Sequence, residues 1–562
     1  MRSPGKIYNR RRWVVIIIAG IVLVLTGLSL TTDYLVIPLL KKRLHTLIVQ
    51  GSDSLYTYTL GNLDASLLTG QITIENLAIV ANGARYKELE KTSDLPPLTL
   101  QLNMVKGEVE GLSILPLLFN RKIAIRSIST KNANVRLYRH LVKSKTVTRK
   151  HVPLWKAIQP SIKGISIQTI NLEGIKLLYR NADTTTAVKL QFDTCNAVFN
   201  HLRIDSVAAT DPTRVGFSKE VTFRFSDLKF RSADSSSKLK AASVTYSSKT
   251  RRAEINRFKL QPTLEEKQAF YSFFQNSQAM NVIEFERAIL TNFGLDQFIN
   301  DNRISADSLL LQSPGVDIYV DKTFPAAFSN KIGTYPHQRL LNAAMQIAVK
   351  SIAVRGANIS YTEKAARSKQ EGTLTLADID MDIKNVTNLP GSIKENNRCD
   401  ARISGTILGN SPINARFIFD LDSANGSFEA SGNITNVDAA QLNRLAVPLA
   451  NVQFESFNLR ELNYSLRGND DKTVGTVVLA YDKLFLTIRK RDRETGIATT
   501  NDFLTKIVNK YTLQPSNPAP GKKLRTANVT QLRLTSQGFF GLIWKSVFGG
   551  MQSIMLNDGQ TK

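Results

Sequence analysis

Residues 123–138 (IAIRSISTKNANVRLY) recur in altered form as residues 304–319 (ISADSLLLQSPGVDIY), at an offset of 181 residues. Two further pairs of segments keep the same order along the chain: residues 165–179 with 347–361, and residues 72–79 with 253–260. Their offsets are 182 and 181 residues, which a tandem duplication explains and three independent coincidences do not. Internal repeats of this kind predict an elongated body in which successive units stack on one another.

Apolar and polar residues alternate within each repeated segment, and this period of two is typical of β-strands with one apolar face. In the first segment, residues 131–134 (KNAN) separate two alternating runs and favour a turn. We therefore predict a β-hairpin in each segment. About twenty such strands with few helices leave two alternatives, compact β-sandwiches or one twisted antiparallel sheet that forms an open gutter.

Composition narrows the class of protein. The 562 residues are 42% hydrophobic, which excludes wholesale disorder. The net charge of +26 is spread along the chain and favours anionic partners such as nucleic acid, acidic lipid surfaces or acidic proteins. The two cysteines, Cys195 and Cys399, have no metal-binding spacing.

An apolar run near the N-terminus predicts a membrane anchor. Residues 13–30 carry no charge and, as a helix, would be about 27 Å long, which is enough to cross a bilayer core. Five basic residues within residues 2–12 predict a cytoplasmic N-terminus. A cleaved signal peptide is the alternative, although the run is long and no A-x-A-like site follows it. The next residues, 31–50, are either an interfacial amphipathic segment or a helix packed on the first strands.

These features divide the chain into segments. We predict a basic cytoplasmic tail at 1–12, the anchor at 13–30, a membrane-proximal segment at 31–50, β repeats at 51–230 and 231–410, a C-terminal β section at 411–490, a charged, Pro-rich linker with a strand at 491–530, and an amphipathic helix at 538–556. A helical insertion is predicted at 263–300, because Thr263 and Glu266 have the spacing of a capping box.

The C-terminal helix places apolar residues three and four positions apart, which suits a membrane interface, a partner groove or the end of a sheet that it caps. Together with the two ends of the anchor, these residues form the predicted membrane contacts: Trp13, Leu30, Phe540, Ile543, Trp544, Val547, Phe548 and Met551.

Signatures of chemistry are missing from the sequence. The five histidines form no HExxH motif, and there is no GxSxG elbow, phosphate-binding loop or dinucleotide fingerprint. Asp378, Asp380 and Asp382 alternate along one predicted strand, without the loop that a calcium site needs. We therefore predict no catalytic residue, no metal and no cofactor. No nucleic-acid-binding motif appears either, and the predicted topology keeps the basic body away from nucleic acid, so we predict no nucleic-acid partner.

Several segments together resemble the AsmA-like family of bacterial envelope proteins. They are residues 67–77 (LLTGQITIENL), 114–128 (ILPLLFNRKIAIRSI), 426–434 (GSFEASGNI), 438–445 (DAAQLNRL) and 475–481 (GTVVLAY), which follow a single N-terminal anchor. The resemblance spans nearly the whole chain. It rests on patterning and not on catalytic signatures.

The resemblance implies a β-gutter that is anchored in the inner membrane and has its bulk in the periplasm. Members of the family are implicated in carrying phospholipids between membranes and in outer-membrane assembly, without a chemical reaction. The implied partners are phospholipids, the inner membrane, and an outer-membrane or periplasmic protein at the C-terminal end. Two alternatives remain: a scaffold or regulator of outer-membrane protein assembly that moves no lipid, and a periplasmic hydrolase without a recognisable motif.

A lipid that leaves its bilayer needs an apolar lining, because each buried methylene contributes roughly 0.8 kcal/mol. The predicted lining consists of apolar residues from the repeated segments: Ile72, Ile74, Ile123, Ile125, Val135, Leu137, Ile165, Ile167, Ile304, Ile347, Val349 and Ile359.

Overall fold

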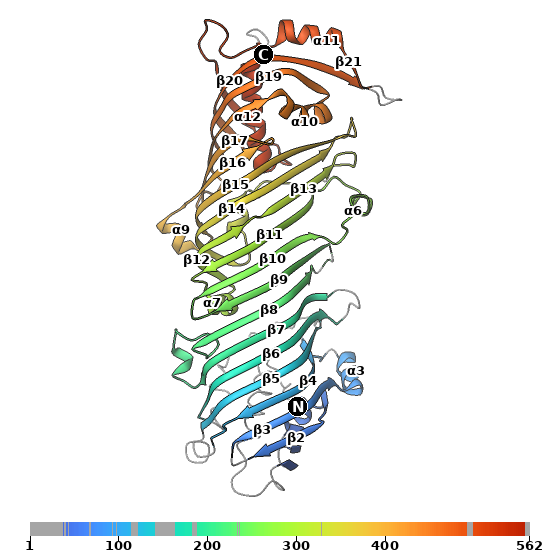
Figure 1. The fold of residues 1–562 in the computed structure, drawn as a ribbon, viewed down its shortest axis with the longest axis vertical. Coiled ribbons are helices and arrows are strands. Elements are labelled where there is room, and N and C mark those ends of the chain that lie inside the picture. The colour runs from blue at the N-terminus through green and yellow to red at the C-terminus, as the bar shows by residue number, and fades with distance from the viewer. Residues whose placement is uncertain are drawn as a thin grey trace, which may run out of the picture. The chain divides into compact units, whose positions relative to one another are not determined.

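The computed structural model describes residues 37–556 except 39–40, 43, 67–68, 93, 97, 114–121, 141–162, 183–187, 233, 235, 327–328 and 492–497. The predicted tail and anchor, with Trp13 and Leu30, lie outside these residues. The chain divides into an N-terminal unit, Met1–Asn256, and a C-terminal unit, Arg257–Lys562. Both units are mainly β, as predicted, and within each unit the strands run side by side (Figure 1).

The N-terminal unit contains a mixed sheet. Its strands are β1 (Tyr56–Thr59), β2 (Asn62–Ser66), β3 (Gln71–Ala81), β4 (Leu98–Glu110), β5 (Lys122–Arg139), β6 (Gly164–Asn181), β7 (Val188–Ile204), β8 (Glu220–Arg231) and β9 (Ser237–Ser247). From β3 to β9, consecutive strands pair antiparallel, except that β5 and β6 are parallel, so the prediction of an antiparallel sheet is wrong at this pair. The helical elements are η1 (Thr46–Gln50), α3 (Gly83–Lys91) and η2 (Ala208–Thr210).

β10 (Arg252–Pro262) crosses the boundary between the units, and the C-terminal unit continues with further strands of mixed direction. Its strands are β11 (Met280–Thr291), β12 (Arg303–Gln312), β13 (Gly315–Asp321), β14 (Gln346–Lys364), β15 (Glu371–Thr387), β16 (Arg398–Ile407), β17 (Ser411–Asp420), β18 (Phe428–Asp438), β19 (Val452–Gly468), β20 (Lys472–Arg491), β21 (Ala498–Thr500) and β22 (Thr526–Leu532). β12 and β13 both pair parallel with β14, and the strands from β14 to β20 pair antiparallel in succession.

Helices of the C-terminal unit lie between and beside these strands. They are α6 (Lys267–Phe274), α7 (Leu295–Asp301), α8 (Pro336–Leu341), α9 (Pro390–Glu395), α10 (Ala439–Ala450), α11 (Asp502–Ile507), η3 (Val508–Thr512) and α12 (Phe539–Met555). The predicted insertion at 263–300 is therefore wrong in extent, because it contains strand β11 between α6 and α7. The aromatic residues of the two elements resemble one continuous helical pattern in the sequence. Phe270 and Tyr271 of α6 pack into a small core, whereas Phe285 belongs to strand β11.

The predicted hairpins are also wrong. β5, β6 and β14 each run through the whole repeated segment as a single strand. Asn132 in β5 and Gly174 in β6 have left-handed φ values of 54° and 64°, but the chain keeps its direction beyond them. Asparagine and glycine favour turns because they tolerate this conformation, and the same tolerance lets them bend a strand.

The duplication is visible in the strand pairing of the two units. In the N-terminal unit, Ile123 lies opposite Ile165 in the parallel pair of β5 and β6. In the C-terminal unit, Ile304 lies opposite Ile347 in the parallel pair of β12 and β14. Left-handed φ values recur at corresponding positions too, at Asn132 and Ser313 and at Gly174 and Gly356.

Gly174 provides a test of the bent strands. An alanine there would keep a φ of +64°, and its Cβ would lie 2.7 Å from Asn132 Oδ1. At Gly356, which also has a φ of +64°, no atom lies within 4 Å of an added Cβ. We expect Gly174→Ala to lower the free energy of unfolding by about 2–3 kcal/mol and Gly356→Ala by about 1–2 kcal/mol. Chemical denaturation measures both, and equal losses would contradict a role for the Asn132 contact.

Candidate functional site

One face of the N-terminal sheet carries apolar side chains that lie opposite one another from strand to strand. Residues that are directly opposite on paired strands point to the same face of a sheet. One row crosses seven strands: Ile79, Leu102, Val135, Leu177, Phe192, Leu228 and Ala241. Two further rows consist of Leu100, Leu137, Tyr179, Leu190, Phe230 and Leu239, and of Ile72, Val109, Ile128, Ile170, Phe199 and Val221. We call the surface formed by these rows the N-terminal apolar face.

The opposite face of the same strands is mostly polar. A row one residue away from the first consists of Gln101, Arg136, Leu178, Gln191, Lys229 and Lys240. Ion pairs lie on these strands, with Lys229 Nζ 2.8 Å from Asp193 Oδ2 and Lys106 Nζ 2.6 Å from Glu108 Oε1. The sheet is therefore amphipathic, with one face suited to water.

Left-handed residues keep the apolar side chains on one face along the bent strands. In β3, Ile74 and Leu77 lie three positions apart and would point to opposite faces of a regular strand. Both are buried in one apolar cluster, because Asn76 between them has a φ of 52° and shifts the alternation by one residue. Asp227 does the same between Phe225 and Leu228 of β8. The predicted lining of β3 stops before Asn76 and omits Leu77 and Ile79, although a shifted alternation across Asn, Asp or Gly is the signal that identifies such residues.

The predicted lining residues of the first repeat all lie on or beside the N-terminal apolar face. Six of them belong to a compact cluster that also includes Leu44 and Ile48 from the helical residues before β1: Ile72, Ile74, Ile123, Ile125, Ile165 and Ile167. Leu44 and Ile48 thus pack on the first strands, as the second of the two alternatives for this segment expects. Val135 and Leu137 are only half-buried, as are all six residues of the row that contains Leu137. The face is therefore sealed at one end of its strands and partly accessible at the other.

In the C-terminal unit, the predicted residues also share one face of the sheet. Ile304 lies opposite Ile347, Val349 opposite Val386, and Ile359 opposite Leu376. Val349 is buried, whereas Ile304, Ile347 and Ile359 are half-buried. The pairing continues as a row of mostly apolar residues: Met381, Ile403, Ala415, Gly432, Tyr464, Val477 and Ala527. We call this surface the C-terminal apolar face.

The predicted membrane contacts in α12 lie on two different sides of that helix. Ile543 and Val547 are 7% and 4% exposed because they pack in the core of the C-terminal unit, and Met551 is half-buried against it. Their inclusion among the membrane contacts was wrong, since these side chains face the sheet. Phe540, Trp544 and Phe548 are exposed. The helix thus caps the sheet with one side and presents aromatic rings on the other.

The polar groups singled out in the sequence have structural partners. Asp380 accepts a hydrogen bond from the Gly356 backbone N–H at 2.9 Å, and Asp382 pairs with Arg355 at 2.6 Å. Among the described residues, no group of three or more His, Cys, Asp or Glu could hold a metal ion. Cys195 and Cys399 are free and buried, and burial raises the pKa of each thiol to about 11.

The chain matches no protein-family model and no curated protein. Within the part of the chain that the structure describes, no helix is both long and apolar enough to cross a bilayer.

Proposed function

We propose that the two apolar faces bind lipid acyl chains, and that the protein helps to move phospholipid between the inner and outer membranes of a bacterial envelope. In this proposal each sheet curves into an open gutter, residues 13–30 anchor the chain in the inner membrane, and the sheets lie in the periplasm. No chemical step is involved. The observation that carries the proposal is the unbroken row of apolar side chains across seven strands of the N-terminal unit.

Burial of an acyl chain against this apolar row is energetically favourable. An acyl chain that lies across the strands would contact an apolar side chain on each strand, about every 4.8 Å, which is the distance between neighbouring strands. Each methylene that leaves water contributes roughly 0.8 kcal/mol, and an even lining spreads this gain along the path. The row through Leu137, Tyr179 and Leu190 is half-buried, so an acyl chain can contact these side chains without displacing residues of an internal core. The resemblance to AsmA-like proteins is in accord with this proposal.

Leu177 and Leu178 provide a matched pair for the test, because both are half-buried neighbours on β6 that belong to opposite faces. Leu177 lies between Val135 and Phe192 on the apolar face, whereas Leu178 lies between Arg136 and Gln191. A carboxylate against an acyl chain loses its hydration, so we expect Leu177→Asp to weaken binding of a fluorescent phospholipid by at least about tenfold. Leu178→Asp should bind like the wild type.

The assay uses the full chain in detergent and titrates a phospholipid with a fluorescent acyl chain. Ile125 and Ile167 are unsuitable for this test because they are 3% and 1% exposed, and a charge there would unfold the core. Equal binding by the two leucine variants and the wild type would contradict the proposal. That result would favour a scaffold in outer-membrane protein assembly, whose activity does not depend on the apolar face.

A further inference from the structure

One side of α12 lies on the C-terminal apolar face, against β20 and β22. Leu542 is 0% exposed, and Ser546 shares a buried hydrogen bond with Thr473 of β20 at 2.5 Å. The approach is close at Gly550, where an added Cβ would lie 2.6 Å from Val477 Cγ2. Val477 belongs to the apolar row of this sheet, so α12 covers the part of the face that would otherwise continue the lining.

The exposed side of α12 provides apolar surface in place of the strand residues that the helix covers. Phe540, Trp544 and Phe548 are spaced four residues apart, which places them in one stripe along the helix. They are 66%, 61% and 42% exposed, and the Trp544 and Phe548 rings stack with their centroids 5.7 Å apart. Phe540 meets the ring of Phe417 at 6.0 Å, so the stripe begins at the sheet. Phe417 lies opposite Ala401 and Ala430 on the same sheet.

We propose that this aromatic stripe, Phe540, Trp544 and Phe548, is the acyl-chain contact of the C-terminal unit. The inference rests on the proposed function and adds to it the residues that take over the lining where α12 covers the strands. Space for a chain lies beside the rings, because Gly549 has no atom within 4 Å of an added Cβ and Gly541 meets only a Gln537 side-chain carbon at 3.5 Å.

An acyl chain suits the stripe better than a bilayer surface does. Helices that lie in a membrane interface combine an apolar side with a polar side rich in lysine and arginine. In α12 the second side is not polar but buried in protein, and Lys545 is the single charged residue of the helix. The stripe therefore lacks the cationic flank that would hold it to anionic headgroups. It offers aromatic surface to a hydrocarbon.

Trp544 reports directly on this contact. The sequence has three tryptophans, Trp13, Trp155 and Trp544, so Trp13→Phe/Trp155→Phe leaves one fluorophore in the full chain. The probe is a short-chain phosphatidylcholine with brominated acyl chains, kept below its micelle concentration, and the control is the same lipid without bromine. We expect saturable quenching of Trp544 by the brominated lipid alone. Phe548→Ser should weaken the apparent affinity by roughly five- to tenfold, whereas Lys545→Gln should leave it unchanged.

Three results would overturn the inference in distinguishable ways. Quenching by brominated vesicles but not by the monomeric lipid would make the stripe a membrane contact. No quenching, together with lipid binding that still depends on Leu177, would refute the α12 contact and leave the proposed function intact. No quenching and no lipid binding would refute both. Phe540→Ser provides a second variant in case Phe548→Ser does not fold.

Discussion

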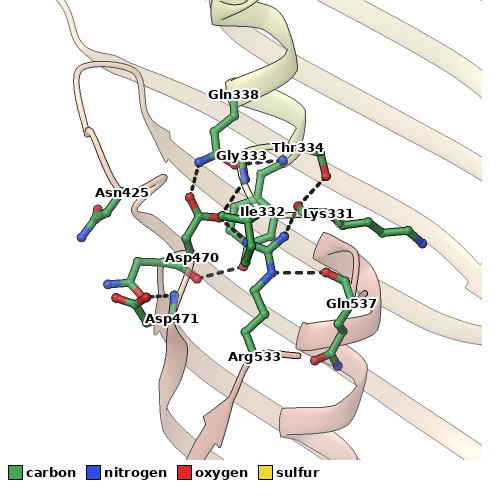
Figure 2. A network of polar contacts seen from close by, with 12 residues as sticks. Lys331, Ile332, Gly333, Thr334, Gln338, Asn425, Asp470, Asp471, Arg533 and Gln537 are labelled. Carbon is green, nitrogen blue, oxygen red and sulfur yellow. Dashed lines mark hydrogen bonds and ion pairs between the residues drawn. The ribbon is translucent and has the colours of Figure 1, made fainter. Parts of the chain in front are cut away.

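Arg533→Ala is expected to destabilise the C-terminal unit by about 3–5 kcal/mol, since it breaks a buried ion pair and leaves the partner charge uncompensated. The Arg533 side chain is 0% exposed and pairs with the Asp470 carboxylate. Figure 2 shows the guanidinium enclosed by its partners. It donates to the backbone carbonyls of Lys331 and Gln537, the latter at 3.2 Å, and lies 4.1 Å from the ring centre of Tyr335.

The network matters because it joins three distant parts of the chain. Asp470, in the turn between β19 and β20, also accepts a hydrogen bond from Gln338 of α8 at 2.6 Å. Arg533 follows β22 and precedes α12, so the pair holds the start of that helix to the sheet (Figure 2). Loss of Arg533 should therefore loosen α12 as well as remove a charge.

Urea denaturation in the Trp13→Phe/Trp155→Phe background, followed through Trp544 fluorescence, measures the effect. The control is Arg398→Ala, because Arg398 forms a 3.0 Å pair with Glu429 in which both side chains are largely exposed. That pair should contribute less than about 1 kcal/mol. We also expect the double variant Arg533→Ala/Asp470→Ala to lose less free energy of unfolding than the two single variants lose in sum. If Arg533→Ala and Arg398→Ala lowered the free energy of unfolding by similar amounts, burial would not be what makes the Arg533–Asp470 pair important.

Acid is expected to destabilise the same region through His337. Its ring is 2% exposed and stacks on Phe419, with the ring centroids 5.0 Å apart. Burial lowers the pKa of His337 to about 4, and the nearby Asp470 carboxylate only partly offsets this shift. The unfolded chain then takes up a proton below about pH 6.5 that the folded protein does not.

Stability due to neutral His337 is thus complete above about pH 6.5 and is lost as the pH falls towards 4. From the two pKa values, the loss between about pH 7 and pH 4 amounts to about 3 kcal/mol. His337→Phe keeps a ring against Phe419 and removes the titration. The free energy of unfolding of this variant should therefore fall by about 3 kcal/mol less than that of the wild type over this range. Parallel curves for the two proteins would show that His337 does not contribute.

Strand content was predictable from the sequence, but strand direction was not. Alternation identified the segments around Ile123, Ile165 and Ile347 as β, because period two reflects a sheet with unequal faces. A hairpin and a bent strand use the same residues at their midpoint, so Asn132 and Gly174 could not distinguish them. Only the pairing of β5 with β6 shows that the chain continues in one direction.

Side-chain accessibility was less predictable, because it depends on segments far away in the chain. The pattern placed Ile125 and Val135 on one face, but Ile125 is buried in one cluster with Leu44 and Ile48, whereas Val135 is only half-buried. In α12 the three-four spacing identified a helix, yet both of its sides are apolar. The sequence therefore could not indicate which side would meet the sheet.

The left-handed residues within the strands also limit how the protein can change in evolution. Asn76 and Asp227 each correct the alternation of their strand, so the residues on either side depend on a fixed count from that point. An insertion or deletion of one residue between Asp227 and Phe230 would turn the remaining hydrophobic side chains outward and place charged ones among hydrocarbon. Length variation in relatives should therefore concentrate in the connections beyond the strand ends, whereas the strand interiors keep a constant length.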